Sequence, residues 1–434
     1  MKFLVRGRRK LEGAVNVRGA KNAATKMMVA SLLTREPLIL ENFPFIGDTD
    51  VTGELCRTFG TTLTPDLKRS SLVLQTAEIT QHEAPRLSRR NRIPILALGP
   101  LLARVGKARV PIVGGDKIGP RPVDLHMDAL RALGAVIEES SEGYEAEAPK
   151  GLSGANIHFK FPSVGATENA ILAAVLARGH TVIRNAAVEP EITDLIKLLQ
   201  KMGAIIGLGA DRTVYIDGVQ RLRGATHRIL PDRNEAVSFA ILAVATDGNV
   251  MVRGTRQDDL VTFLNILRKI GGGFEVQDEG IRFFKEREFA SVEVETDTHP
   301  GFMTDWQQPT VVLLTQAQGV SVVHETIYED RFGYAEDLNR MGARITVFSK
   351  CLGEIPCRFS GMGCKHSAVV HGPTALSGTT LHVRDLRSGM AHVVAALVAD
   401  GESVIEGIEE IDRGYEDLDG RLRALGADIE RRSE

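Results

Sequence analysis

Helical and strand-like hydrophobic patterns alternate along the 434 residues of the chain. A helical pattern that stops at a glycine and then continues as a strand recurs six times. The glycines that close these helices are Gly60, Gly134, Gly203, Gly271, Gly342 and Gly426. A glycine directly after the last helical residue is the usual C-terminal cap of a helix. Intervals of roughly 70 residues between these caps predict six copies of one structural unit.

The other half of each copy is a more apolar helix that runs through a turn into a Val/Ile-rich strand. These segments cover residues 27–40, 95–113, 170–184, 237–252, 311–323 and 391–406. Four of them share a glycine turn, at Gly179, Gly248, Gly319 and Gly401. We therefore expect each copy to read helix, turn, strand, loop, helix, glycine, then strand or hairpin. One copy cannot bury its apolar faces alone, so the copies must pack on each other.

The number of copies favours an α/β protein of two domains with three copies each. A single apolar core stops growing at roughly 250–300 residues. The break is expected near Leu230, which places residues 21–230 in one domain and residues 1–20 with 231–434 in the other. The strand pattern at Lys2–Val5 precedes the first copy, and we expect it to pair with the last.

Composition excludes several functional classes. The chain has 53 Lys and Arg against 56 Asp and Glu, a net charge of −3. It therefore has no global basic field, and nucleic acid is not expected as a partner. The first residues are too charged for a signal peptide, and the longest apolar runs, such as 93–103, are about half the length of a membrane span. With only four cysteines no disulfide framework is expected, and we predict a cytoplasmic protein without a membrane partner.

Polar residues recur in two positions of the repeated unit. One lies just before the first helix and includes Lys21, Arg92 and Arg387; the other follows the strand and includes Arg121 and Arg331. If the copies are related by pseudo-symmetry, these groups gather at one end of each domain, and two facing domains form a cleft for a phosphate ester or diphosphate. Basic residues are not helix-capping residues, whereas we interpret Asp48 and Asp412 as helix caps.

Two further segments stand out. The loop from Gly114 to His126 combines three glycines and two prolines with charged residues, which is typical of a lid or binding loop. The longest copy has an insertion with Cys351, Cys357, Cys364 and His366. These four residues could hold zinc, but their spacing matches no common zinc pattern. We favour a cysteine-rich, partly buried loop and predict no metal.

The sequence resembles the UDP-N-acetylglucosamine 1-carboxyvinyltransferases nearly from end to end, except around residues 348–370. The stretches that carry the resemblance are 19–23, 114–126, 163–167, 231–233, 304–305, 330–332, 385–387 and 411–416. The related shikimate enolpyruvyl transferases begin with Ser-Lys-Ser where this chain has Gly-Ala-Lys-Asn. The resemblance implies a two-domain inside-out α/β barrel, with the active site between the domains and the loop around Asp116 as its lid.

It also implies an activity: transfer of the enolpyruvyl group of phosphoenolpyruvate to UDP-N-acetylglucosamine, the first committed step of peptidoglycan synthesis, with no cofactor. By motif, Lys21 contacts phosphoenolpyruvate, Asp305 takes the proton of the sugar 3-hydroxyl, and Asp116 is the general acid. Arg121 and Arg387 correspond to contacts of the phosphate, and Arg331 and Arg387 to contacts of the carboxylate. The residues that match UDP-sugar contacts are Asn22, Arg92, Pro122, Val123, Asp124, Leu125, Ser163, Val164, Gly165 and Ile327.

Asp116 departs from most members, which have a cysteine there that reacts with the epoxide fosfomycin. To donate a proton, an aspartate needs a pKa raised by burial once the lid closes, so we expect the neighbouring Lys117 to point outward. A carboxylate is a poorer nucleophile than a thiolate, so we predict insensitivity to fosfomycin. Phe161, where many members have lysine, is a second departure.

Two other functions remain open from the sequence. One is an enolpyruvyl transferase that acts on a different nucleotide or nucleoside, because fold and motif do not determine the acceptor. The other is a non-catalytic paralogue that binds a UDP-sugar. The presence of Lys21, Asp305, Arg331 and Arg387 together argues against the paralogue, because a protein that only binds has no need of a general base. The oligomeric state stays open.

Overall fold

The computed structural model describes residues 1–84, 87–88, 92–112, 114, 122–354 and 357–433. The chain forms two compact units, and it changes from one to the other between Arg18 and Gly19 and again between Leu230 and Pro231. We call the described part of residues 19–115 and 122–230 the N-terminal unit, and that of residues 1–18 and 231–434 the C-terminal unit. The predicted Gly114–His126 loop lies largely outside the described residues, as do Asp116, Lys117 and Arg121.

The C-terminal unit contains three four-stranded sheets. The strands of the first sheet, in sheet order, are β21 (Thr380–His382), β22 (Glu402–Glu406), β1 (Lys2–Arg6) and β23 (Asp428–Arg432). Those of the second are β15 (Gly272–Gln277), β16 (Gly280–Lys285), β14 (Asn249–Arg253) and β2 (Glu12–Asn16). Those of the third are β17 (Glu293–Glu295), β18 (Gly319–His324), β20 (Ser367–Gly372) and β19 (Arg344–Phe348). Its helices are α7 (Arg233–Ala245), η3 (Gln257–Asp259), α8 (Val261–Ile270), α9 (Thr304–Leu314), α10 (Ala335–Arg340), α11 (Leu386–Val398), α12 (Glu409–Asp412) and α13 (Leu418–Ala424).

The N-terminal unit repeats this plan. The strands of its first sheet, again in sheet order, are β11 (Ile205–Leu208), β12 (Val214–Asp217), β10 (His180–Arg184) and β9 (Asn156–His158). Those of the second are β13 (Ala225–Arg228), β3 (Leu38–Glu41), β5 (Ser71–Gln75) and β4 (Thr62–Asp66). Those of the third are β6 (Lys107–Pro111), β8 (Gly143–Glu147) and β7 (Val136–Glu139). Its helices are α1 (Lys21–Ala30), η1 (Ser31–Leu33), α2 (Gly47–Thr58), η2 (Ile93–Ala97), α3 (Leu98–Val105), α4 (Asp124–Ala132), α5 (Val164–Ala174) and α6 (Pro190–Lys201).

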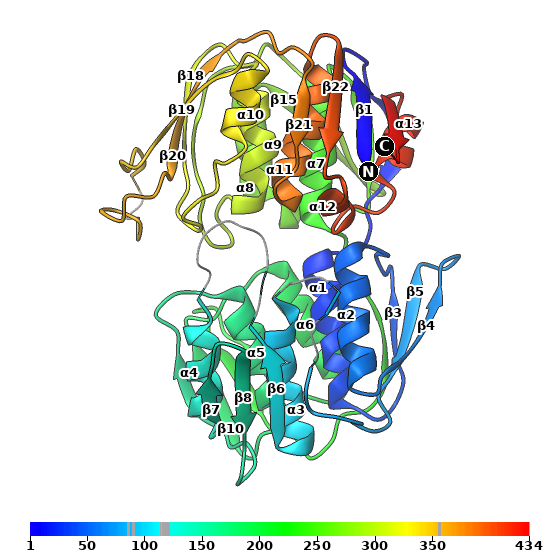
Figure 1. Ribbon diagram of the computed structural model, residues 1–434, viewed down its shortest axis with the longest axis vertical. Coiled ribbons are helices and arrows are strands. Elements are labelled where there is room, and N and C mark those ends of the chain that lie inside the picture. The colour runs from blue at the N-terminus through cyan, green and yellow to red at the C-terminus, as the bar shows by residue number, and fades with distance from the viewer. Residues whose placement is uncertain (85–86, 89–91, 113, 115–121, 355–356, 434) are drawn as a thin grey trace. The chain divides into compact units, whose positions relative to one another are not determined.

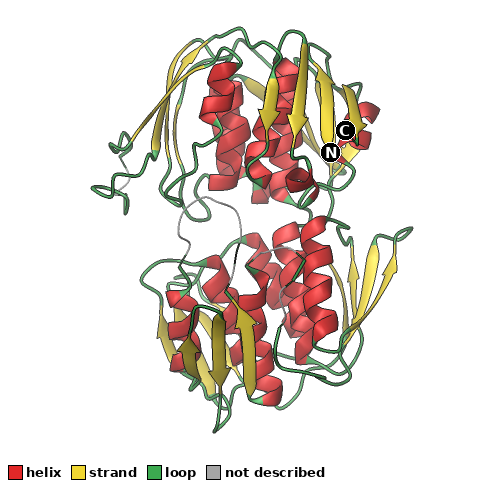
Figure 2. Cartoon of the chain, viewed as in Figure 1, coloured by secondary structure: helices red, strands yellow, loops and turns green. Residues whose placement is uncertain are grey.

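In each unit the helices form the centre and the sheets lie outside them (Figures 1 and 2). This is the inside-out α/β barrel that the resemblance implies. The inner helices are apolar on all sides, as expected for helices surrounded by protein. Every residue of α11 is buried, and so are residues 233–244 of α7. Because α7, α9 and α11 contact one another, their first turns can present side chains to a common site.

The predicted pattern of the repeat is confirmed at its glycines. All six capping glycines have positive φ, between 96° at Gly426 and 121° at Gly271. The predicted pairing of the first strand with the last copy is confirmed as well, because β1 lies antiparallel between β22 and β23. Among the four turn glycines, Gly179, Gly319 and Gly401 have positive φ, whereas at the remaining turn Asp247 adopts it, with a φ of 52°, in place of Gly248.

Two predicted caps are wrong. Asp48 is the second residue of α2, not its N-cap, and its carboxylate lies 2.8 Å from the Lys21 ammonium group. Asp412 ends α12, and it pairs with Arg431 at 2.8 Å. In both cases the local sequence pattern predicted that the carboxylate caps a helix, but the carboxylate instead forms an ion pair with a residue distant in the sequence. Within the described ranges, no helix has the length and apolar character needed to cross a membrane.

Candidate active site

The first turns of three inner helices bring the polar residues of the C-terminal unit together. Asp232 caps α7 by accepting hydrogen bonds from the backbone N–H groups of Asn234 and Glu235, at 2.8 and 3.2 Å. Asp385 caps α11 in the same way, at 3.0 Å to the N–H of Arg387. Asp305 is the second residue of α9. Helix N-termini carry partial positive charge, so this end of the unit favours anions.

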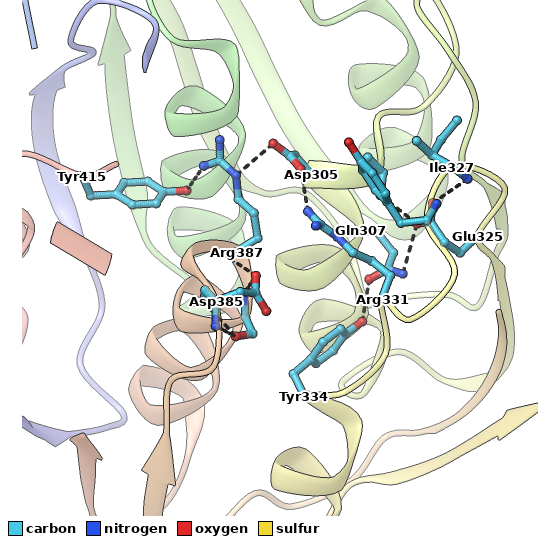
Figure 3. A network of polar contacts seen from close by, with 12 residues as sticks. Asp305, Gln307, Glu325, Ile327, Arg331, Tyr334, Asp385, Arg387 and Tyr415 are labelled. Atoms are coloured by element: carbon cyan, nitrogen blue, oxygen red, sulfur yellow. Dashed lines mark hydrogen bonds and ion pairs between the residues drawn. The ribbon is translucent and has the colours of Figure 1, made fainter. Parts of the chain in front are cut away.

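Asp305 bridges two guanidinium groups (Figure 3). Its Oδ1 lies 2.5 Å from Arg331 Nη2, and its Oδ2 lies 3.0 Å from Arg387 Nε. The side chains of Arg331 and Arg387 are only 2% and 6% exposed, against 19% for Asp305. Each guanidinium has several N–H donors, and Asp305 uses only some of them. A small anion can therefore bind to the two arginines beside Asp305.

Tyr415 and Ser238 hold Arg387 from its other side. Arg387 Nη1 donates to the Tyr415 hydroxyl at 2.8 Å, and this hydroxyl lies 2.7 Å from Ser238 Oγ. Burial lowers the pKa of the Arg387 guanidinium, but its electrostatic interactions with the Tyr415 hydroxyl and with the Asp305 and Asp232 carboxylates outweigh burial, so that the pKa is raised. Arg387 therefore stays charged, with its planar group fixed in one orientation.

Glu325 organises the segment that carries Arg331. Its buried carboxylate accepts hydrogen bonds from the Thr304 hydroxyl at 2.9 Å and from the backbone N–H groups of Ile327 and Tyr328 at 2.8 and 3.2 Å. Burial raises the pKa of the Glu325 carboxyl, although the charge of Arg331 opposes that rise. Burial by itself lowers the pKa of the Arg331 guanidinium. The negative charges of Asp305 and other nearby acids outweigh burial, so that the pKa of Arg331 is raised. The backbone of Ile327, a predicted sugar contact, is thereby tied to the helix that carries Asp305.

Sequence reasoning did not assign a role to Tyr415 or Glu325. Tyr415 lies inside a stretch that carried the resemblance, next to Gly414 and Glu416. Glu325 follows a largely apolar strand, and a second polar residue, His324, stands immediately before it. Such a pair at the end of an apolar strand is a signal that could have identified the position, because a buried acid requires partners.

In the N-terminal unit, Lys21 and Asn22 open α1, and both are half-buried. The Lys21 ammonium lies 2.8 Å from the Asp48 carboxylate, and the two side chains are 13% and 10% exposed. An ion pair largely shielded from water orients the ammonium group more firmly than an exposed pair does. Asp48 therefore holds Lys21, the residue that the resemblance places at phosphoenolpyruvate.

A second cluster in the N-terminal unit joins the starts of η2, α4 and α5. Arg92 Nη2 donates to the Pro122 carbonyl at 3.3 Å, Val123 precedes α4, and Asp124 pairs with Lys160 at 2.9 Å. Burial and then the charge of Arg92 lower the pKa of His126 to about 3, so this imidazole is neutral.

The start of α5 packs closely on α4. Ser163 caps α5 by accepting from the Ala166 N–H at 3.4 Å, and Val164 is the first helical residue. A Cβ atom on Gly165 would lie 3.0 Å from His126 Cε1, so glycine allows this approach. Leu125 lies on the same first turn of α4, half-buried. Apart from Asn22, which lies on α1, the predicted sugar contacts of this unit thus lie at the starts of η2, α4 and α5.

The two groups of predicted residues belong to separate units. Lys21, Asn22, Arg92, residues 122–125 and residues 163–165 belong to the N-terminal unit, and Asp305, Ile327, Arg331 and Arg387 to the C-terminal unit. Asp116 and Arg121 lie outside the described residues. The assembly of these groups into one cleft stays a prediction.

Below the helix starts of the N-terminal unit, α5 buries Glu168 with 1% exposure and with Lys26 at 3.8 Å. Burial raises the pKa of this carboxyl, Lys26 opposes the rise, and Glu191 and Glu189 add to it, giving a value of about 7. The folded chain therefore binds this proton more tightly than the unfolded chain, whose pKa is roughly 4.3. The resulting stabilisation is complete below the unfolded pKa and is lost as pH rises through about 7.

Replacing Glu168 by glutamine is therefore expected to stabilise the protein more at pH 8 than at pH 5, by about 2–3 kcal/mol in the free energy of unfolding. Urea denaturation at the two pH values measures this difference. The exposed Glu147→Gln is the control, for which we expect no such pH dependence. An equal effect of Glu168→Gln at both pH values would contradict the prediction.

Comparison with known proteins places this geometry in a family. The sequence profile of the family described as EPSP synthase (3-phosphoshikimate 1-carboxyvinyltransferase) matches residues 5–422. Among solved structures, the enolpyruvyl transferase NikO from Streptomyces tendae superposes with a TM-score of 0.86 at 22% identity, over 99% of this chain and 98% of that one. EPSP synthase from Acinetobacter baumannii gives 0.73 at 16% identity, over 99% of both chains. These structures establish the fold, as expected from the sequence.

Sequence relatives are much closer. The UDP-N-acetylglucosamine 1-carboxyvinyltransferase of Protochlamydia amoebophila is 49% identical, over 96% of this chain and 92% of the relative. The proteins of the same name from Chlamydia pneumoniae and Acidiphilium cryptum are 50% and 44% identical, over 97% and 98% of this chain and 93% and 98% of theirs. The chain therefore belongs to the family of UDP-N-acetylglucosamine 1-carboxyvinyltransferases.

Proposed function

We propose that this chain transfers the enolpyruvyl group of phosphoenolpyruvate to the 3-hydroxyl of UDP-N-acetylglucosamine and releases phosphate. The observation that carries the proposal is the Asp305 carboxylate held between the buried guanidinium groups of Arg331 and Arg387. The choice of acceptor is supported by relatives named UDP-N-acetylglucosamine 1-carboxyvinyltransferase, whose similarity extends over nearly the whole chain. The product would enter peptidoglycan synthesis.

The proposed reaction has two stages. In the first, Asp305 accepts the proton of the sugar hydroxyl, whose oxygen forms a bond to C2 of phosphoenolpyruvate, while Asp116 donates a proton to the methylene C3. The product is a tetrahedral ketal that carries both the sugar oxygen and the phosphate. In the second stage a base removes a proton from the new methyl group, the C2–O bond to phosphate breaks, and the double bond re-forms. Lys21 and the arginines stabilise the anionic groups throughout.

Competition for its two arginine partners would make Asp305 available as a base. Its two oxygens contact the donors that a substrate carboxylate requires, Arg331 Nη2 and Arg387 Nε. A carboxylate of phosphoenolpyruvate that binds these donors competes with Asp305 for them. The displaced Asp305 carboxylate would then be free to accept a proton from the sugar hydroxyl. Arg387, fixed by Tyr415, would keep its orientation during this exchange.

The test is phosphate release from phosphoenolpyruvate by the full-length chain with UDP-N-acetylglucosamine. We expect release that requires both substrates, together with a nucleotide product whose mass has increased by an enolpyruvyl group. UDP-N-acetylgalactosamine, which differs only in the configuration at C4, is the matched control acceptor. Phosphate release with another nucleotide but not with UDP-N-acetylglucosamine would contradict the proposed acceptor. Binding of the UDP-sugar without any turnover would contradict the catalytic role.

A further inference from the structure

One end of the sheet β17-β18-β20-β19 collects four residues with metal-binding side chains. His324 is the last residue of β18, and His366 directly precedes β20. His324 and Phe348, the last residue of β19, both pair with Ser367, so the ends of β18 and β19 meet where β20 begins. Cys351 and Cys357 belong to the segment that leads from β19 to β20, at one end of this sheet (Figure 1).

The ligand atoms of these residues converge on one point. One atom each of His324, Cys351, Cys357 and His366 lies within 4.8 Å of the other three. Cys351 Sγ is 3.2 Å from His366 Nε2. Around a tetrahedral zinc ion, with bonds of about 2.3 Å to sulfur and about 2.0–2.1 Å to nitrogen, ligand atoms are roughly 3.3–3.8 Å apart. The four side chains therefore need only small movements to surround a zinc ion.

The other nitrogen of each imidazole already has a partner. His366 Nδ1 lies 2.8 Å from the Cys364 carbonyl oxygen, and His324 Nδ1 lies 2.8 Å from Ser367 Oγ. A hydrogen bond at Nδ1 orients the ring and leaves Nε2 for a metal, which is the usual arrangement around zinc-binding histidines. His324 Nε2 is buried and has no hydrogen-bond partner among the described residues. Such a buried polar atom requires an explanation, and a metal ion supplies one.

We propose that His324, Cys351, Cys357 and His366 bind one zinc ion as a closed structural site. Two thiolates and two imidazoles are a ligand set that zinc prefers, and four protein ligands leave no position for a reacting water. Two of the four positions belong to strand ends, which places them accurately relative to each other. Its assignment does not rest on the proposed catalytic function.

This ligand set differs from the one considered in the sequence. Cys364 lies 4.0 Å from Nδ1 of His366, the ring nitrogen that faces away from the cluster. His324 takes its place, although 26 residues separate it from Cys351. Local spacing failed to match a zinc pattern because the fourth ligand comes from a neighbouring strand.

The zinc ion would fasten the insertion against the candidate active site. The insertion passes so close to His324 that a Cβ atom on Gly353 would lie 2.5 Å from its Cδ2. Beyond Cys357, the Arg358 guanidinium donates to the carbonyl oxygen of Ile327. The residue after His324 is Glu325, which accepts from the N–H groups of Ile327 and Tyr328. The metal would therefore hold Ile327 through the insertion on one side and through β18 on the other.

The first experiment uses the wild-type chain, purified without chelator, and measures its metal content and the alkylation of its cysteines by mass spectrometry. We expect one zinc per chain. Zinc should slow alkylation of Cys351 and Cys357 about tenfold or more compared with chelator-treated protein, because bound thiolates are not free nucleophiles. Cys364 should react equally in both samples. Equal reactivity of Cys351 with and without metal would overturn the proposal, as would a Cys351–Cys357 disulfide, detected as a mass lower by two hydrogens.

The second experiment compares variants loaded with Co²⁺, whose visible spectrum reports tetrahedral thiolate ligation. Cys351→Ser and Cys357→Ser should each remove about half of the thiolate-to-cobalt charge-transfer absorption, because two thiolates contribute to it. The matched control, Cys364→Ser, should retain the full spectrum. Loss of the spectrum in Cys364→Ser, or an unchanged spectrum in His324→Asn, would overturn the assigned ligands. Circular dichroism confirms that each variant is folded, and the wild-type alkylation result stands without the variants.

Discussion

Replacing Asp305 by asparagine is expected to lower kcat for enolpyruvyl transfer by about 10²–10⁴-fold, the range typical for loss of a general base. The amide has nearly the shape of the carboxylate, but it cannot accept the proton of the sugar hydroxyl. It also no longer competes for Arg331 and Arg387 with full negative charge. We therefore expect a Kd for phosphoenolpyruvate, measured with UDP-N-acetylglucosamine present, that is no higher than that of the wild type.

This combination separates catalysis from structural support. A purely structural role for Asp305 would weaken binding along with turnover, because two buried cations would lose their partner. Arg387→Lys is the comparison variant, since lysine keeps the charge but cannot form the planar, two-donor contact. We expect it to raise the Kd for phosphoenolpyruvate as well as lower kcat. A wild-type kcat in Asp305→Asn would show that another group takes the proton.

Exchanging Asp116 for cysteine is expected to make the enzyme sensitive to fosfomycin while it stays active. The wild type should keep its activity after incubation with this epoxide, because a carboxylate attacks an epoxide much more slowly than a thiolate does. Asp116→Asn should lose about 10²-fold or more in kcat, since an amide cannot donate the proton to the methylene carbon. Residual activity after timed incubation, followed by mass spectrometry of the intact protein, measures all three.

The wild type itself is the control in this comparison, because it has the same four native cysteines as the Asp116→Cys variant but no thiol at residue 116. Burial raises the pKa of Cys56 to about 12, so that this thiol is unreactive. A fosfomycin adduct on Asp116 of the wild type would contradict the prediction. Full activity of Asp116→Asn would instead show that Asp116 is not the acid.

The repeat and the residues at helix starts could be predicted from the sequence because their signals are local. A glycine after a helix shows where that helix ends, and the six capping glycines, from Gly60 to Gly426, all have positive φ. A change in hydrophobic period distinguishes helix from strand within a few residues. Lys21 and Arg387 could be located at the starts of α1 and α11 for the same reason.

The partners of these residues were decided only by the tertiary structure. Arg331 and Arg387 follow Asp305 by 26 and 82 residues, and they meet because α9, α11 and the segment after β18 pack together. Lys21 meets Asp48 through the packing of α1 on α2, although the local pattern indicated a cap for Asp48. His324 joins Cys351 through strand register. Local periodicity determines where elements begin and end, whereas contacts between distant side chains depend on strand order and helix packing, which no short stretch of sequence contains.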